Sequence, residues 1–166
     1  MGAVPAAAQP TPMPLDMIGV GPHGYDFMIG RWDCTEAAAM LGKRPVAWAM
    51  KVQMVGDGSL LQVMSSNGFG IWVQPLRYIS ETKTWSISEA NEGGNIIYSQ
   101  TTQDTGQKTL WIGWELSGSQ DIPPHKIYAR DTWTFPSLDE FLDATERQTG
   151  ARGTWEAWQN STCKRS

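Results

Sequence analysis

Short segments in which apolar and polar residues alternate recur about every ten to fourteen residues. In residues 46–55, for example, Trp48, Met50, Val52 and Met54 take every second position. Gly, Asn, Asp and Pro residues separate the segments. A period of two predicts β-strands, and this spacing is typical of an antiparallel sandwich or barrel. We expect an all-β fold, a closed barrel of about eight to ten strands, at approximately 31–39, 46–55, 59–66, 69–79, 83–89, 95–103, 108–116, 127–135, 141–148 and 154–164.

One segment allows two interpretations. Ser137 followed by Glu140 fits a helix capping box, so residues 137–148 could form a short helix. A strand is favoured, because the glycines at 150 and 153 then make a hairpin into the last strand. Long helices between strands are not predicted, which disfavours an α/β fold. We expect a flexible Ala- and Pro-rich segment over 1–20, then one domain over 21–166 that begins with a helical turn.

The composition excludes two classes of partner. The net charge is −4 and the basic residues are not clustered, so a nucleic-acid partner is not expected. Since no apolar run approaches the ~20 residues of a membrane span, none is predicted. A second copy of the chain is a further candidate partner. Residues 1–14 carry no charge and resemble the segment just after a signal peptide, which predicts a periplasmic or secreted protein. The alternative is a cytoplasmic protein with a disordered tail.

The two cysteines stand in the first and last predicted strands, at Cys34 and Cys163. In a closed sheet these strands are neighbours, so a disulfide is geometrically feasible. It would close a loop of more than a hundred residues, worth ~4–5 kcal/mol in the chain-entropy model. The alternative is two buried free thiols. Neither cysteine has metal-ligand spacing, and no metal is expected.

The start of the first strand carries a longer pattern, Tyr25-Asp26-Phe27-Met28-Ile29-Gly30-Arg31-Trp32. Gly30 permits a tight bend, and Trp32 is expected to plug one end of a barrel. The pattern aromatic-Asp-Phe-x-x-Gly-x-Trp resembles the start of a bacterial lipocalin-like (calycin) family of uncharacterised function. In that family the last hairpin tends to read Gly-x-Thr-Trp and the domain closes with a basic residue. Residues 153–155 and Lys164-Arg165 occupy those places. The resemblance implies a barrel with a central cavity and supplies no catalytic residues.

The many tryptophans suggest the first functional hypothesis, which is binding of a small hydrophobic, aromatic molecule. Trp residues on neighbouring strands can line one inner surface, where their N–H groups are free to hold polar atoms. The alternative is a filled core. The predicted ligand-binding residues are Trp48, Met50, Trp85, Trp114 and Trp133.

The second hypothesis is a cofactor-independent lyase, isomerase or cyclase that works by acid–base catalysis. Alternation from Trp32 brings Glu36 inward, and alternation from Trp85 brings Glu89 inward; buried carboxylates have raised pKa values. The alternative is that they are solvated at the rim. Arg77 turns inward only if Pro75 introduces a bulge. The predicted catalytic residues are Glu36, Glu89, Tyr98, Asp131 and Arg77. Since no nucleotide or phosphate fingerprint occurs, no cofactor is expected.

Overall fold

The computed structural model describes residues 13–37, 45–66, 70–91, 96–104, 106–117, 125–149 and 152–166. Two 3-10 turns, η1 (Leu15–Met17) and η2 (Asp26–Met28), precede the strands. The strands in these ranges are β1 (Gly30–Ala37), β2 (Val46–Met54), β3 (Leu60–Ser66), β4 (Gly70–Ile79), β5 (Thr84–Asn91), β6 (Ile96–Asp104), β7 (Lys108–Ser117), β8 (His125–Ser137), β9 (Glu140–Thr149) and β10 (Glu156–Arg165).

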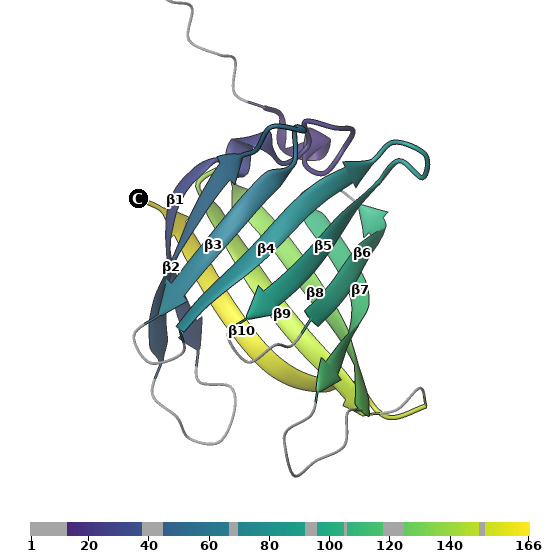
Figure 1. Cartoon of the computed structure of the whole chain (residues 1–166). Helices are drawn as coiled ribbons and strands as arrows, with labels where there is room; N and C mark the ends of the chain where they lie inside the picture. The colour runs from purple at the N-terminus through teal and green to yellow at the C-terminus, as the bar shows by residue number, and fades with distance from the viewer. Residues whose placement is uncertain are drawn as a thin grey trace, which may run out of the picture.

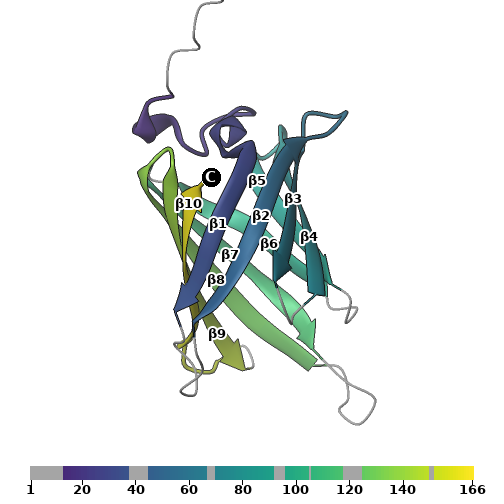
Figure 2. The ribbon, with the colours of Figure 1, turned by 90° about the vertical axis from the view of Figure 1, so that its left-hand side faces the viewer.

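The strands form one strongly curled antiparallel sheet. Each strand pairs with its neighbours along the chain, and β1 pairs both with β2 and with β10, so that the pairing closes into a barrel (Figures 1 and 2). The all-β antiparallel prediction is confirmed, and the predicted strand positions agree within a few residues. Among the described residues, no helix is long and apolar enough to cross a membrane.

The ambiguous segment forms strand β9, so the helix interpretation is wrong. Ser137 ends β8, and its Oγ accepts a hydrogen bond from the Asp139 N–H at 3.2 Å in the turn to β9. A Ser that caps a helix uses the same hydroxyl on a nearby backbone N–H, which explains why the local sequence suited both structures.

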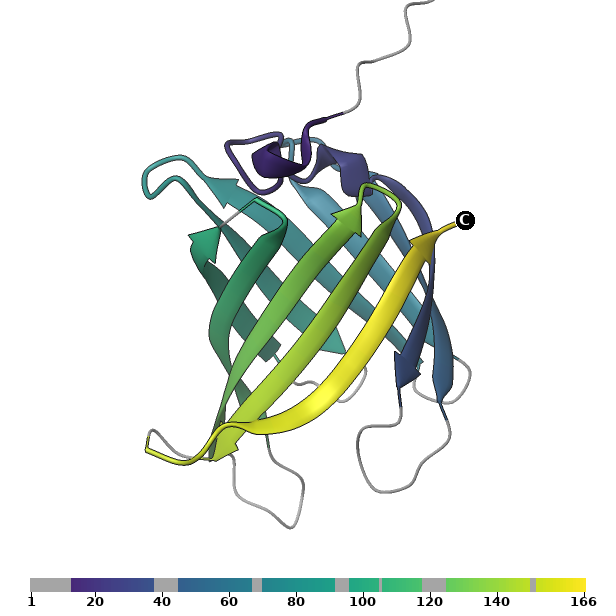
Figure 3. The ribbon, with the colours of Figure 1, turned by 180° about the vertical axis from the view of Figure 1, so that it is seen from behind.

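The segment 13–29 covers one end of the barrel, which we call the closed end (Figures 1 and 3). Ile18 is fully buried, although residues 1–20 were predicted to be flexible. The Trp85 Nε1–H donates to the carbonyls of Gly19 and Gly21, both at 3.1 Å, which anchors this segment to β5. Residues 15–20 therefore belong to the folded domain. We call the opposite end, where β1 ends and β2 begins, the far end.

Arg165 holds the closed end together, as the last residue of β10. Its guanidinium lies 4.6 Å from the centre of the Trp32 ring, and its Nη1–H donates to the Ile29 carbonyl at 2.9 Å. Its Nε–H donates to Asp139 Oδ1 at 2.7 Å. Gly30 has φ +140°, and a Cβ there would lie 2.9 Å from Arg165 Nη1. This position therefore favours glycine for its backbone conformation, and a larger residue would also displace the Arg165 guanidinium.

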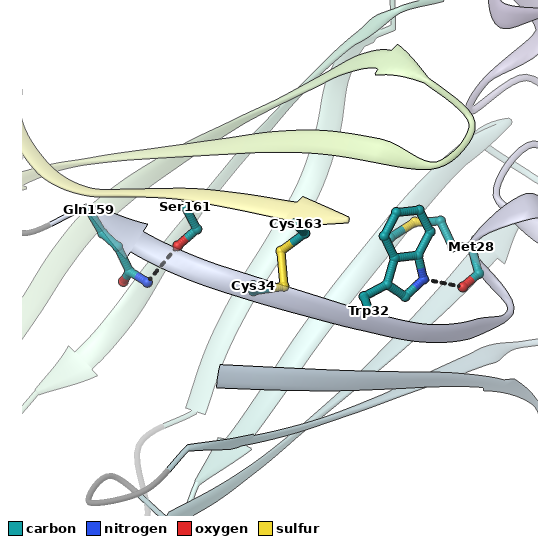
Figure 4. The surroundings of a disulfide bond; sticks show 6 residues. All are labelled: Met28, Trp32, Cys34, Gln159, Ser161 and Cys163. Atoms are coloured by element: carbon teal, nitrogen blue, oxygen red, sulfur yellow. Dashed lines mark hydrogen bonds between the residues drawn. A yellow bond between two sulfur atoms is a disulfide. The ribbon is translucent and has the colours of Figure 1, made fainter. Parts of the chain in front are cut away.

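Trp32 is buried at the closed end, as predicted, with its Nε1–H donating to the Met28 carbonyl at 2.8 Å. Two residues further along β1, Cys34 is bonded to Cys163 on β10 (Figure 4). The two cysteines are 129 positions apart in sequence and face each other in register, so the interpretation as free thiols is wrong. We use this disulfide as the boundary between a closed half and a far half of the interior.

Candidate functional site

The strand register assigns each side chain to the inner or outer face. Residues directly opposite each other on paired strands share a face, and successive residues on one strand alternate. On β8 and β9, Trp133 and Phe141 are buried, whereas Leu142 is 39% exposed. Odd-numbered residues of β9 therefore point inward, and the same alternation places Asp143 on the inner face.

The closed half is filled by packed aromatic rings. Trp111 and Trp133 lie 4.9 Å apart between ring centres, and Tyr25 meets Trp85 edge-on at 5.1 Å. The Tyr25 hydroxyl is 2.6 Å from Thr109 Oγ1 and shares a hydrogen bond with it. We call this group the aromatic cluster; its members are Tyr25, Phe27, Trp32, Trp85, Trp111, Trp133, Phe135 and Phe141.

The far half of the inner face is polar and only partly buried. Asp131, Asp143, Thr145 and Arg147 point inward from β8 and β9, yet each is half-buried. Trp48 on β2 is also inward-facing and half-buried. The inward-facing side chains of the closed half, such as Trp32 and Trp111, are by contrast fully buried.

Asp143 is the most perturbed of these polar residues. It lies opposite Trp133 on β8 and Ser161 on β10, and its Oδ1 is buried without a hydrogen-bond partner among the described residues. Burial raises its pKa well above the usual range, and the Asp131 carboxylate raises that pKa further. Asp131 is opposite Thr145, which makes it the diagonal neighbour of Asp143. The two acids form a pair that favours protonation of Asp143.

Four further buried polar atoms on the inner face are unpaired among the described residues. They are Trp48 Nε1, Gln62 Nε2, Ser66 Oγ and Trp111 Nε1. Trp48 and Ser66 are opposite each other on β2 and β3, and Gln62 is opposite Val52 on the same pair of strands. β2 lies half-way round the ring of strands from β7, which carries Trp111. Unpaired polar atoms therefore occupy two opposite walls of the interior.

The predicted catalytic residues have different positions. Glu36 lies on the inner face near the end of β1, half-buried and opposite Ser161, while Asp131 is part of the acid pair. Arg77 is exposed, so its predicted inward position is wrong: Pro75 pairs with Leu61 in unbroken register and introduces no bulge. The side chains of Glu89 and Tyr98 lie outside the described part; the backbone of Glu89 pairs with Ile97 and that of Tyr98 with Trp114.

The predicted ligand-binding residues also lie in different parts of the barrel. Met50, Trp85 and Trp133 are buried in the closed half, and the Trp85 N–H is already occupied by backbone carbonyls. Trp48 lies in the far half. Trp114 points outward, with the Lys126 Nζ 4.4 Å from the ring centre, so its predicted place in the interior is wrong.

Trp111 and Asp143 were missed by the sequence analysis, although the sequence contained a signal for each. The strand predicted at 108–116 offered two faces, and Trp111 stands on the face that the structure turns inward. Asp143 follows Phe141 at a spacing of two in the strand predicted at 141–148. A buried aromatic at 141 predicts an inward residue at 143.

No group of three His, Cys, Asp or Glu side chains that could hold a metal ion occurs in the described ranges. Comparison with known proteins gives no family model that matches the chain, and no curated protein matches it either.

Proposed function

We propose that the barrel binds a small hydrophobic, aromatic molecule in the far half of its interior. The observation that carries this proposal is the set of buried, unpaired polar atoms on the inner face. Buried polar groups are normally hydrogen-bonded, and each unmet one costs about 1–3 kcal/mol. A ligand that enters from the far end would bond the far-half members of this set, Trp48 Nε1, Ser66 Oγ and Asp143 Oδ1, and stack on the exposed part of the Trp48 indole.

The architecture supports a lipocalin-like assignment as part of the same proposal. Gly30, Trp32 and Arg165 interlock at the closed end, and these residues belong to the sequence pattern that resembles the lipocalin-like family. A barrel closed at one end and accessible at the other suits retention of a small molecule.

The disulfide bears on the cellular compartment of the protein. Disulfides persist in oxidising compartments such as the periplasm and the extracellular space. The Cys34–Cys163 bond therefore favours a periplasmic or secreted protein over a cytoplasmic one.

The test uses calorimetric titration with a panel of two-ring aromatic compounds. We expect binding by the wild type and at least about tenfold weaker binding by Ala129→Phe, because Ala129 is an inner-face residue opposite Gly113 and the added ring would occupy the interior. The matched control is Ala144→Phe, since Ala144 points outward from β9. The proposal fails if no compound binds, or if both variants bind like the wild type.

The acid pair favours a second candidate function, a cofactor-independent lyase or isomerase. Protonated Asp143 could serve as a general acid toward an aromatic substrate, with Asp131 as its charged neighbour. Turnover of a bound compound that disappears in Asp143→Asn while binding persists would establish this activity. Binding without turnover leaves the first proposal as the function.

A further inference from the structure

The unpaired polar atoms of the interior are mainly hydrogen-bond donors. An indole N–H is a donor only, which applies to Trp48 and Trp111, and Gln62 presents its amide nitrogen. Ser66 contributes a hydroxyl that can donate or accept. The interior thus offers N–H groups from β2, β3 and β7 that lack an acceptor among the described residues.

Asp143 adds a donor of a different kind. A protonated carboxyl group donates one hydrogen bond, and burial beside Asp131 favours that protonated form. The charged or titratable residues that face it are Asp131 on β8 and Arg147 on its own strand. The residues of β10 nearest to it are Gln159, Ser161 and the disulfide-bonded Cys163, none of which titrates; beyond them, Glu156 is opposite Arg147 and Glu36 of β1 is opposite Ser161.

We propose that the ligand of this interior presents oxygen acceptors, as a neutral aromatic ketone or quinone does, to the far-half donor groups of Trp48 and Asp143. The inference rests on the proposed binding function and specifies the ligand's chemistry. An aromatic amine supplies no acceptor for the Trp48 indole N–H, although its ammonium group is attracted by the Asp131 carboxylate. A plain hydrocarbon would leave that N–H unmet as well, while gaining the same aromatic contact.

A series of compounds with nearly equal shape separates these ligands. The series consists of 2-acetylnaphthalene, 2-ethylnaphthalene and 1-(2-naphthyl)ethylamine, which differ at one carbon. We expect the ketone to bind about tenfold more tightly than the hydrocarbon, since one good hydrogen bond is worth about that factor. The ammonium compound should also bind less tightly than the ketone. Calorimetric titration at neutral pH measures all three dissociation constants.

Variants assign the preference to individual donors. Trp48→Phe removes the indole N–H and keeps an aromatic ring, so the affinity for the ketone should fall toward that for the hydrocarbon. Trp114→Phe, on the outer face of β7, is the control and should change neither affinity. Trp111→Phe removes an unpaired N–H of the closed half and should leave the ketone preference unchanged.

Asp143 is tested through pH. In the wild type, ketone binding should weaken as the pH rises through the raised pKa of Asp143, because the deprotonated acid no longer donates. Asp143→Asn supplies an amide N–H at every pH, so it should bind the ketone with a flat pH profile.

The outcomes are distinguishable from failure of the proposed function. If none of the three compounds binds, both proposals fail. If the hydrocarbon or the ammonium compound binds as tightly as the ketone, binding stands and the acceptor inference is overturned. A ketone preference that survives unchanged in Trp48→Phe also overturns it, since the indole donor assigned here would then play no part.

Discussion

The two halves of the barrel interior differ in how their polar groups are satisfied. In the closed half the indole N–H groups of Trp32 and Trp85 donate to backbone carbonyls and the Tyr25 hydroxyl bonds to Thr109, while Trp111 Nε1 and Gln62 Nε2 are exceptions without a partner among the described residues. In the far half the Trp48 N–H and Asp143 Oδ1 are buried without partners among the described residues. Tryptophan occurs in both halves, so its presence does not by itself distinguish a structural core from a binding surface.

The difference has a structural origin. The segment 13–29 brings free backbone carbonyls over the closed end, and these carbonyls accept from Trp32 and Trp85. At the far end the described inner face holds side chains of the strands alone, and the two acids on β8 and β9 repel each other. We infer that the closed half supplies stability and that the far half sacrifices some stability for binding.

Truncation of one tryptophan in each half gives the largest expected contrast. Trp32→Ala should lower the free energy of unfolding by about 3–5 kcal/mol, because it removes a fully buried ring that packs on Phe141 and Arg165. Trp48→Ala should cost only about 1 kcal/mol, because the ring is half-buried and its N–H is unpaired. Urea unfolding measures both values. Equal losses would contradict the comparison.

Replacement of Asp143 by an apolar residue should increase the stability of the fold instead of lowering it. We expect Asp143→Leu to raise the free energy of unfolding by about 1 kcal/mol at neutral pH, since it removes an unpaired buried polar group beside Trp133. Leu142→Asn on the outer face of the same strand is the control and should change stability little. A loss of stability in Asp143→Leu would show that Asp143 has a structural partner.

The pH dependence of the same residue has a definite sign. The folded pKa of Asp143 lies above the ordinary value of 3.8, so the folded chain keeps a proton that the unfolded chain releases. The free energy of unfolding should therefore fall as the pH rises from about 3.8 to the raised pKa. In Asp143→Asn this fall should be absent, and the difference between the two unfolding curves measures it.

The smallest effect is expected on the outer face of the same two strands. The Arg130 Nε–H donates to Glu146 Oε2 at 2.6 Å, and this pair lowers the pKa of Glu146. Both side chains are about a third exposed, so water and salt screen the pair. A double-mutant cycle with Arg130→Met and Glu146→Gln should give a coupling of about 0.5 kcal/mol. A coupling free energy larger than the stability change of Asp143→Leu would show that the outer ion pair contributes more to stability than the inner acid pair does.

The strands could be predicted from sequence because alternation is a local property. Facing was harder. The segment 108–116 has apolar residues on both faces, and the structure turns Trp111 inward because β7 pairs with β8 so that Trp111 is opposite Asp131. This register depends on long-range pairing, which the local pattern of β7 does not contain. Trp114 was assigned inward because its neighbours on that face are apolar, whereas Ile112 beside it is 40% exposed.

The acid pair was predicted only in part for the same reason. Asp131 was identified as an inward candidate from its spacing to Trp133, but its partner is on the next strand, and only the pairing of β8 with β9 brings Asp143 close. The other predicted catalytic acids, Glu36 and Glu89, stand on β1 and β5. Their inward orientation was predicted from the alternation along each strand. Their distance from Asp131, however, depends on the order of the strands around the barrel.

The disulfide also bears on the order in which the barrel forms. Every strand pairing except β1 with β10 joins strands that are adjacent along the chain, and such local hairpins form quickly. The β1–β10 pairing must wait for the two ends of the chain to meet, and it sets the pace of closure. Once Cys34 and Cys163 are bonded, that encounter no longer depends on diffusion of the chain ends. An oxidised chain that has unfolded should therefore refold faster than a reduced one, with the last pairing converted into a local event.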